Sequence, residues 1–511
     1  MAVDGTYSRE RRAWWLLVVL LTGQFMANVD TAIVNVAAPS ISTGLGASGG
    51  ELELVISGYT LAYAMLLITG ARLGDMRGYR RIFLIGLGAF TLASLTCGLS
   101  PNAVTLILAR MVQGTGAALM VPQVLSGIQL NFTGARRARA LGFYVATLSS
   151  GAVAGQILGG VLISINLFGS GWRPVFLINV PIGAVLIVAA LRLLPVDRGG
   201  RGQRLDLWGV AALSATVLLA VVPLILGREL RWPGWMWACL IASFPALVAF
   251  IAVERRIAAR DGYPLINLRL LTQPAISWGL LANGTATSTY FSMLFVLALY
   301  LQRGLGRSPL YSGFALVSWV AAFGLARVLL RRLPARVAPF SASAGSLILA
   351  AAYLCISGSL FTGYRDGSLL LTLLGFGGLG LGIGFSALIA HMTAAVSVRD
   401  APDLSGLLTT TSQVSGVAGV AIFGTAYLSL APHSGPDVAV HAFTVITASF
   451  AIMAFLASIA AYQSVRRQAP TTDTTYATSM DTDMPNSDTI DDVERFDAET
   501  GRRQAQAGTS R

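Results

Sequence analysis

Fourteen long apolar runs limit what this chain can fold into more than any other feature of its 511 residues. A run of about 20 apolar residues forms a helix that crosses the roughly 30 Å hydrocarbon core of a bilayer. Transmembrane strands would instead give alternating segments of about ten residues. The runs cover residues 14–36, 52–71, 82–99, 103–129, 138–165, 174–194, 207–226, 235–254, 275–301, 310–330, 339–359, 369–395, 402–429 and 438–464. We therefore predict an all-α integral membrane protein with fourteen transmembrane helices.

The composition agrees with a membrane protein and argues against other classes. Hydrophobic residues make up 54% of the chain and charged residues only 12%, too few charges to cover a soluble fold of this size. The few cysteines and histidines are scattered, so we expect neither a disulfide framework nor a metal site. They are Cys97, Cys239, Cys355, His391, His433 and His441.

The charge distribution predicts membrane orientation and argues against a nucleic-acid partner. The net charge is +12, and all 36 basic residues are arginines that lie mostly in short loops between the apolar runs. If the N-terminus is inside, the inner segments carry about 24 arginines and the outer loops carry six. This asymmetry follows the positive-inside rule. We therefore expect a multi-pass protein of the bacterial plasma membrane with both termini in the cytoplasm.

The glycines indicate an internal repeat. Glycine clusters fall in the fourth and fifth runs and again in the twelfth and thirteenth, their counterparts when the seventh and eighth runs are set aside. Close packing alone explains any one cluster, but matching clusters in both halves are typical of transporters. We predict two six-helix pseudo-repeats plus two inserted helices. The expected segments are a cytoplasmic N-terminus at 1–13, a first bundle at 14–194, a linker with the inserted helices at 195–274, a second bundle at 275–466 and a disordered cytoplasmic tail at 467–511.

Asp30 is the most informative single residue, because we place every other acid in a loop, at a helix end or in the tail. A carboxylate inside a span is costly and is by default a functional-site hypothesis, with a structural hydrogen-bond acceptor as the alternative. Its surroundings set whether it holds a proton. At 1.5 Å per residue, Asp30 lies about 24 Å along its helix and Arg110 about 10 Å below the outer surface. We therefore expect these two residues to pair, with Gln113 one turn further along the same face.

Five motifs follow one another in the first half of the chain. They are VDTAIVNVAAP at 29–39, GARLGDMRGYRR at 70–81, RMVQGTG at 110–116, GAVAGQILGG at 151–160 and WRPVFLINVP at 172–181. The second and third resemble motifs of the major facilitator superfamily. The first, fourth and fifth resemble its fourteen-helix drug:proton antiporter branch. With the span count and the stretch at 300–309, the resemblance extends to about residue 465.

The resemblance implies an exporter that expels a drug-like or antibiotic compound in exchange for protons, by alternating access. It implies no bound cofactor, with the proton-motive force as the energy source, and the chain has no GxxxxGK[ST] phosphate loop. It gives Arg110 a part in proton coupling. It also implies a gating loop that stabilises the outward-open state, formed by Gly70, Asp75, Arg77, Gly78, Arg80 and Arg81. A charged inner loop is also an ordinary orientation signal, to which acids contribute little, so Asp75 is the most telling member.

The fifth-helix motif departs from the family at one position. The antiporter-motif residues are Gly151, Gly155, Gln156, Gly159 and Gly160. The family usually has a proline where this chain has Gln156, and proline would bend the helix. This departure leaves open a second reading, a proton symporter that imports a small metabolite. A membrane enzyme, the third reading, would need a cluster of reactive groups or metal ligands, and the runs offer one Asp and one Arg.

We expect a substrate cavity near the bilayer midplane, between the two halves. The ninth run, the counterpart of the first, is rich in polar residues that should face this cavity and not lipid. The expected lining residues are Asn35, Asn283, Thr287 and Tyr290. A largely apolar cavity suits a small amphiphilic, aromatic or weakly cationic organic substrate. The sequence does not fix the oligomeric state, and a monomer is compatible with it.

Overall fold

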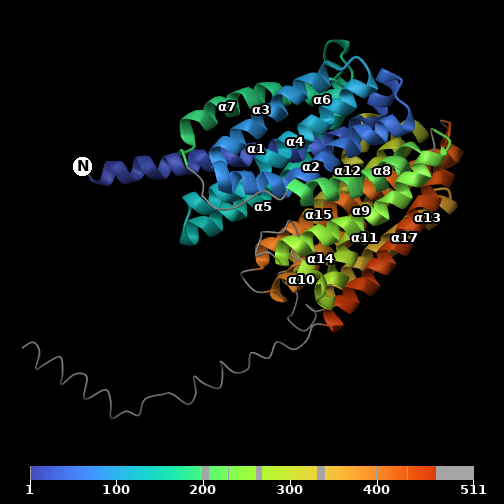
Figure 1. Ribbon diagram of the computed structural model, residues 1–511. Helices are drawn as coiled ribbons and strands as arrows, with labels where there is room; N and C mark the ends of the chain where they lie inside the picture. Colours follow the sequence, from blue (N-terminus) through green and yellow to red (C-terminus); the bar gives the residue numbers. More distant parts are fainter. Residues whose placement is uncertain are drawn as a thin grey trace, which may run out of the picture. The chain divides into compact units, whose positions relative to one another are not determined.

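The computed structural model describes residues 2–197, 207–227, 230–259, 268–330, 340–396, 400–433 and 435–467. These residues form helices joined by short turns, and none of them forms a strand (Figure 1). The helices of the first half are α1 (Ala2–Leu45), α2 (Gly49–Arg77), α3 (Tyr79–Gly98), α4 (Ala103–Asn131), α5 (Gly134–Ile165), η1 (Leu167–Gly169), α6 (Pro174–Leu177) and α7 (Asn179–Leu193). Those that follow are α8 (Leu207–Leu226), α9 (Gly234–Ala259), α10 (Leu268–Leu271), α11 (Pro274–Leu299), η2 (Tyr300–Gly304), α12 (Pro309–Leu330), α13 (Ser341–Phe361), α14 (Ser368–Ala394), α15 (Ala401–Gly419), η4 (Val420–Gly424), α16 (Thr425–Leu430) and α17 (Pro436–Arg466).

Fourteen helical segments of the described chain are long and apolar enough to cross a membrane, which confirms the predicted number of spans and the all-α fold class. Three spans contain more than one helix. The sixth span joins α6 and α7, the ninth joins α11 and the π-helical η2, and the thirteenth joins α15, η4 and α16. The predicted tail beyond Arg467 and the arginine-rich loop at 331–339 lie outside the described residues.

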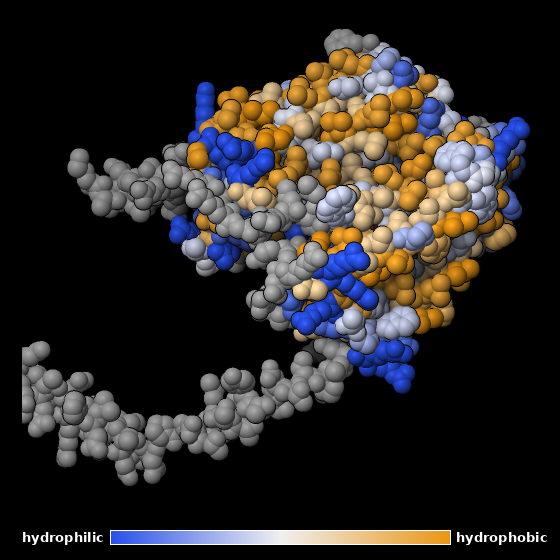
Figure 2. Space-filling view, in the orientation of Figure 1, coloured by the Kyte–Doolittle hydropathy of each residue, from blue (hydrophilic) through white to orange (hydrophobic). Residues whose placement is uncertain are grey.

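The outward surface of the helices is apolar, as contact with lipid requires. Large side chains such as Leu92, Val185 and Phe244 are exposed on α3, α7 and α9. Figure 2 shows apolar residues over much of one face, with hydrophilic residues gathered toward the helix ends.

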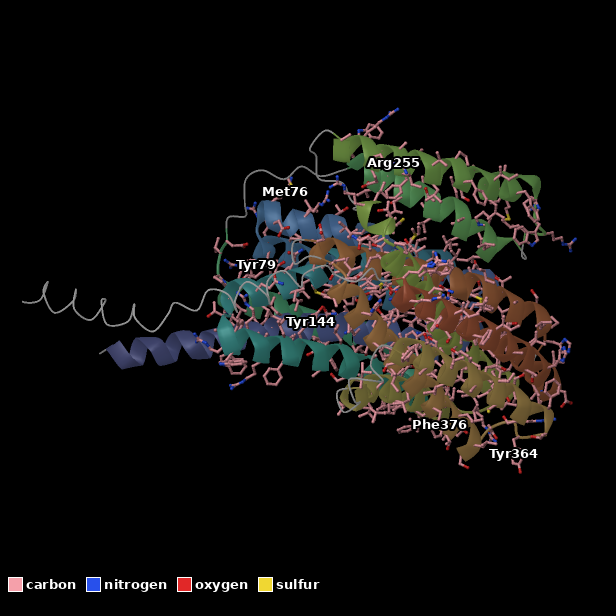
Figure 3. All side chains as sticks on the ribbon, turned by 90° about the horizontal axis from the view of Figure 1, so that it is seen from below. Met76, Tyr79, Tyr144, Arg255, Tyr364 and Phe376 are labelled. Atoms are coloured by element: carbon pink, nitrogen blue, oxygen red, sulfur yellow. The ribbon has the colours of Figure 1, made fainter. Side chains whose placement is uncertain are left out.

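The helix ends define two sides of the molecule. We call the side of residues 77–79 the arginine-rich side, and the side of the loop at 362–367 the arginine-poor side. Figure 3 shows Met76 and Tyr79 at one end of the helices and Tyr364 at the other.

Within each half of the chain, glycines allow two helices to pack closely, and the two halves do so in equivalent ways. A Cβ on Gly114 of α4 would lie 2.2 Å from the backbone oxygen of Tyr59 in α2. A Cβ on Gly378 of α14 would lie 2.1 Å from that of Trp319 in α12. In the first half α4 therefore packs backbone to backbone against α2, and in the second half α14 packs in the same way against α12. Only glycine fits at these contacts. These matching contacts agree with the two predicted pseudo-repeats.

The two inserted helices, α8 and α9, pack against each other, and α8 also packs against the junction of the two bundles. Val217 and Ile225 of α8 belong to one buried apolar cluster that also contains Leu61 of α2 and Leu404 of α15. Because α2 belongs to the first bundle and α15 to the second, α8 touches both.

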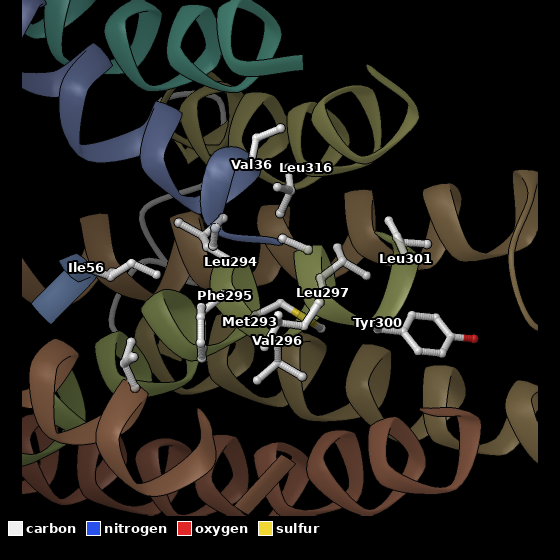
Figure 4. Packing of buried hydrophobic residues seen from close by; sticks show 14 of the residues in the cluster. Val36, Ile56, Met293, Leu294, Phe295, Val296, Leu297, Tyr300, Leu301 and Leu316 are labelled. Carbon is white, nitrogen blue, oxygen red and sulfur yellow. The ribbon is translucent and has the colours of Figure 1, made fainter. Parts of the chain in front are cut away.

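On the arginine-poor side the two bundles are in direct contact. Figure 4 shows Val36 of the first bundle beside Leu316 of the second, within the largest buried apolar cluster. The amide of Gln302 donates to the backbone oxygen of Val36 at 3.0 Å. A Cβ on Gly160 of α5 would lie 2.9 Å from Cα of Leu310 in α12. Opening this side would therefore require the two bundles to separate here.

Candidate functional site

A buried ion pair lies at the centre of the first bundle. Nη1 of Arg110 is 2.5 Å from Oδ2 of Asp30, so the pairing expected from their depths is present. Both side chains are almost fully buried, at 1% and 0% exposure. The amide of Gln113 donates to Oδ1 of Asp30 at 2.7 Å, and its oxygen accepts from Arg110. The structure therefore brings the three predicted proton-coupling residues into one hydrogen-bonded group.

Three further side chains complete this group, which we call the Asp30 network. Asn179 of α7 donates to Oδ1 of Asp30 at 2.9 Å, and the Gln113 amide also donates to Ser94 of α3. The guanidinium of Arg110 lies 4.4 Å from the centre of the Tyr59 ring, in cation–π contact. Five helices therefore position one carboxylate.

All the groups that bind Asp30 within the Asp30 network are donors. Arg110, Gln113 and Asn179 supply them, and an ionised carboxylate is the acceptor that such a set fits. A proton on Asp30 would make it a donor facing donors, so at least one partner would have to turn away. The arrangement can therefore link the binding of one proton to a local rearrangement.

A cavity of about 210 Å³ lies between the bundles, next to the Asp30 network. Its lining residues come from α1, α2, α4, α5, α11 and α15. They are Ala27, Asn28, Thr31, Ala32, Asn35, Tyr59, Tyr63, Val121, Leu148, Ala152, Tyr290, Phe291, Leu294 and Gln413. Thr31 follows Asp30 directly in α1, so one helix presents the acid to one side and lines the cavity with the other.

Two of the four expected cavity residues, Asn35 and Tyr290, line this cavity. The other two do not. The amide of Asn283 points to α15, where it donates to Ser412 at 2.9 Å, and Thr287 is buried in α11 away from the lining. Because α11 is packed on most of its surface, its polar residues serve helix contacts as well as the cavity.

Of the six residues expected to form a gating loop, only Gly78 lies between helices. Gly70 and Asp75 lie inside α2, which runs to Arg77, and α3 begins at Tyr79. Between them Gly78 has φ +91°, a conformation that favours glycine. The rest of the predicted loop is helical because α2 is longer than its apolar run.

Asp197, which sequence reasoning missed, fixes this junction. Its carboxylate accepts from the backbone N–H of Tyr79 at 2.8 Å. Arg80 donates to the backbone oxygen of Leu191, near the end of α7. Asp75, Arg77 and Arg81 are exposed.

The antiporter-motif helix packs against α1 and α12. Gly151, Gly155 and Gly159 face α1, where a Cβ on each would lie within 3.0 Å of a heavy atom, and Gly160 faces α12. Gln156 is fully buried, and the backbone oxygen of Gln156 faces Gly313 of α12. The helix runs without interruption from Gly134 to Ile165, so the glycines act in close packing.

Asp30 is not the only buried acid among the described residues: Glu254, near the end of α9, has no exposed surface, and the second is Glu53. It is buried at 1% exposure, one turn inside α2. The hydroxyl of Thr425, at the start of α16, is 3.0 Å from its Oε2, so this contact joins the two bundles. The signal in the sequence was weak, because Glu53 lies at the edge of its apolar run. Over the described residues, no group of three or more His, Cys, Asp or Glu side chains could hold a metal ion.

The described residues form twelve membrane-spanning segments in two related bundles and two inserted helices, with a cavity between the bundles. This arrangement defines a multi-pass membrane protein of the transporter type. A family model of the Major Facilitator Superfamily matches residues 20–420. The chain therefore belongs to the major facilitator superfamily.

Relatives of the chain support this assignment over most of its length. The probable actinorhodin transporter of Streptomyces coelicolor is 36% identical, over 82% of this chain and 73% of that protein. The cephamycin export protein of Amycolatopsis lactamdurans is 35% identical, over 86% of this chain and 90% of that protein. The puromycin resistance protein of Streptomyces alboniger is 33% identical, over 92% of this chain and 94% of that protein.

Solved structures share the fold. A bacterial homologue of the human lysosomal transporter Spinster, in an inward-facing and occupied conformation, superposes with a TM-score of 0.63 at 17% identity, over 89% of this chain and 97% of that one. An auto-inhibited peptide transporter of the POT family gives a TM-score of 0.64 at 15% identity, over 90% and 97%. At such identities the likeness concerns the fold alone.

Proposed function

We propose that this chain exports a small organic, antibiotic-like compound across the bacterial plasma membrane in exchange for protons, by alternating access. Membership of the superfamily and the names of its relatives, among them an export protein and a resistance protein, support the export. The proposal that protons are exchanged for the compound rests on one observation, the full burial of Asp30 in a group of hydrogen-bond donors beside the cavity. The energy source is the proton-motive force, without a bound cofactor.

In the proposed mechanism Asp30 carries the proton. Protonation removes the ion-pair partner of Arg110 inside an apolar bundle, and breaking a buried pair in this way costs about 3–5 kcal/mol unless the surroundings rearrange. The rearrangement passes along α1, because Thr31 and Asn35 on the same helix line the cavity. Proton binding and substrate binding therefore favour different positions of α1.

The proposed orientation places the arginine-rich side in the cytoplasm, where the positive-inside rule puts basic loops. Single cysteines at Arg136, on the arginine-rich side, and at Tyr364, on the arginine-poor side, test it in a cysteine-free background. Both positions are exposed. An impermeant thiol reagent should label intact cells at 364 and not at 136. The reverse pattern would reject the orientation.

Transport in proteoliposomes tests the proposed function directly. The substrates to test are actinorhodin, cephamycin and puromycin, the compounds named for the relatives. With a pH gradient, the wild-type protein should concentrate at least one of them. Asp30→Asn keeps size and hydrogen bonding but removes the titratable group, so it should only equilibrate the compound. Asp437→Asn, the same change at an exposed carboxylate, is the matched control and should behave as wild type. Gradient-driven accumulation by Asp30→Asn at the wild-type level would reject the proton role of Asp30.

A further inference from the structure

The wall of the cavity between the bundles has aromatic rings on two opposing elements. Tyr59 and Tyr63 of α2 are nearly parallel, with ring centres 6.3 Å apart and an angle of 4° between their planes. Tyr290 and Phe291 of α11 form an edge-on pair at 5.2 Å. Since α2 belongs to the first bundle and α11 to the second, a ligand in the cavity lies between rings from both. Such walls favour a flat aromatic ligand, which can stack on either set.

The described residues that line the cavity carry no charge. Asp30 lies behind the wall with no exposed surface, and its oxygens are already bound to Arg110, Gln113 and Asn179. A cation entering the cavity would therefore lose its water without meeting a carboxylate, which is strongly unfavourable. Arg110 already lies over the Tyr59 ring, so cation–π contact is left to Tyr63, Tyr290 and Phe291. Such contact is worth about 2 kcal/mol, less than the several kcal/mol that the desolvation of an unpaired cation costs.

Neutral hydrogen-bonding groups remain available in the same wall. The amide nitrogen of Asn35 is bound to the backbone of its own helix, which leaves its oxygen as an acceptor. Tyr63, Tyr290 and Gln413 also line the cavity, and their side chains make no hydrogen bond to another described residue. Two hydroxyls, one carboxamide and one amide oxygen can thus bind hydroxyl and carbonyl groups of a ligand.

We infer that the cavity selects flat aromatic compounds that are uncharged and rich in hydroxyl and carbonyl oxygens, and that it discriminates against permanent cations. This inference rests on the proposed transport function and narrows the class of substrate. Charge selection comes from the absence of a carboxylate in the described wall, and shape selection from the rings of α2 and α11.

Equilibrium binding to purified protein in lipid nanodiscs, without a pH gradient, tests the inference. The probes are 1,8-dihydroxyanthraquinone, which is neutral, and N-methylacridinium, a three-ring permanent cation. The quinone should bind at least tenfold more tightly than the cation. Equal affinity, tighter binding of the cation, or no binding of the quinone would overturn the inference. Since no gradient is present, failure of proton coupling leaves this result unchanged, and a failure here leaves proton coupling untouched.

Variants of the wall sharpen the test. Tyr290→Phe should weaken quinone binding about three- to tenfold, since one hydrogen bond is lost. Tyr353→Phe removes a buried hydroxyl outside the cavity and is the matched control, with no expected change.

A carboxylate placed in the wall should reverse the charge selection. Asn35→Asp should raise the affinity for the acridinium cation at least tenfold. Gln413→Glu makes the same change at a less buried position and should act alike if the Asn35 variant does not fold. If a folded variant leaves the affinity for both probes unchanged, the cavity is not the binding site.

Discussion

Replacing Gly378 with alanine should destabilise the second bundle by an amount that follows from the geometry. The added Cβ would lie 2.1 Å from the backbone oxygen of Trp319, whereas ordinary contact begins at 3.4 Å, so α12 and α14 must separate by about 1.3 Å. The blocking atom belongs to the backbone and cannot rotate away. Overpacking of this kind costs about 1–3 kcal/mol, and we expect the upper end of that range.

The matched control lies one turn away on the same helix. A Cβ on Gly375 would meet nothing closer than 4.0 Å, so alanine there should be neutral or stabilise the helix by about 1 kcal/mol. The free energy of unfolding is measured in detergent with a chemical denaturant, followed by tryptophan fluorescence. Gly114→Ala in the first bundle should match Gly378→Ala, since its Cβ would lie 2.2 Å from Tyr59. Equal stability of the Gly375 and Gly378 variants would refute the close-contact reasoning.

Three further predictions concern the site and its supports. Arg110→Gln should abolish gradient-driven transport, and the Asp30→Asn, Arg110→Gln double variant should be little worse than either single one; multiplied losses in the same transport assay would mean that the two residues act independently. Gly78→Ala should lower the free energy of unfolding by about 1–3 kcal/mol, because φ is +91° and the Cβ would lie 2.6 Å from Asp197, whereas Gly142→Ala, with nothing nearby, should not. Thr425→Val should lower the free energy of unfolding by about 1–3 kcal/mol, because it removes the hydroxyl that binds the Glu53 carboxylate, whereas Ser429→Ala, at an exposed hydroxyl, should leave it unchanged. Equal free energies of unfolding for the two variants would show that the contact between the bundles adds no stability.

The spans could be predicted from the sequence because an apolar run of this length has few other uses. Their ends could not. α2 begins at Gly49, before its apolar run, because Ser48 and Glu51 form a capping box that starts the helix earlier. That shift places Glu53 a full turn inside the helix, where Thr425 can bind it. A pattern of apolar residues carries no information about such a cap or about a partner 372 residues away.

Only the part of the site that depends on depth along the helices could be predicted from the sequence. Depth along two helices was enough to pair Asp30 with Arg110, since an acid and a base at one level in an apolar bundle have few other partners. Asn179 and Asp197 were missed, because their partners lie 149 and 118 residues away and no local spacing connects them. Asn283 and Asn35 both looked suited to a cavity. The direction in which each points depends on how its helix rotates against its neighbours, which tertiary packing decides.

Proton movement during transport tests the central claim most directly. Proteoliposomes containing a pH indicator are loaded with whichever of actinorhodin, cephamycin or puromycin the wild-type protein transports, and no pH gradient is imposed. As the compound leaves down its own gradient, the wild-type and Asp437→Asn proteins should carry protons in the opposite direction, in a fixed ratio to the compound. Asp30→Asn should pass the compound with no proton movement. A proton flux through Asp30→Asn equal to that of the wild type would contradict the assignment of Asp30 as the proton carrier.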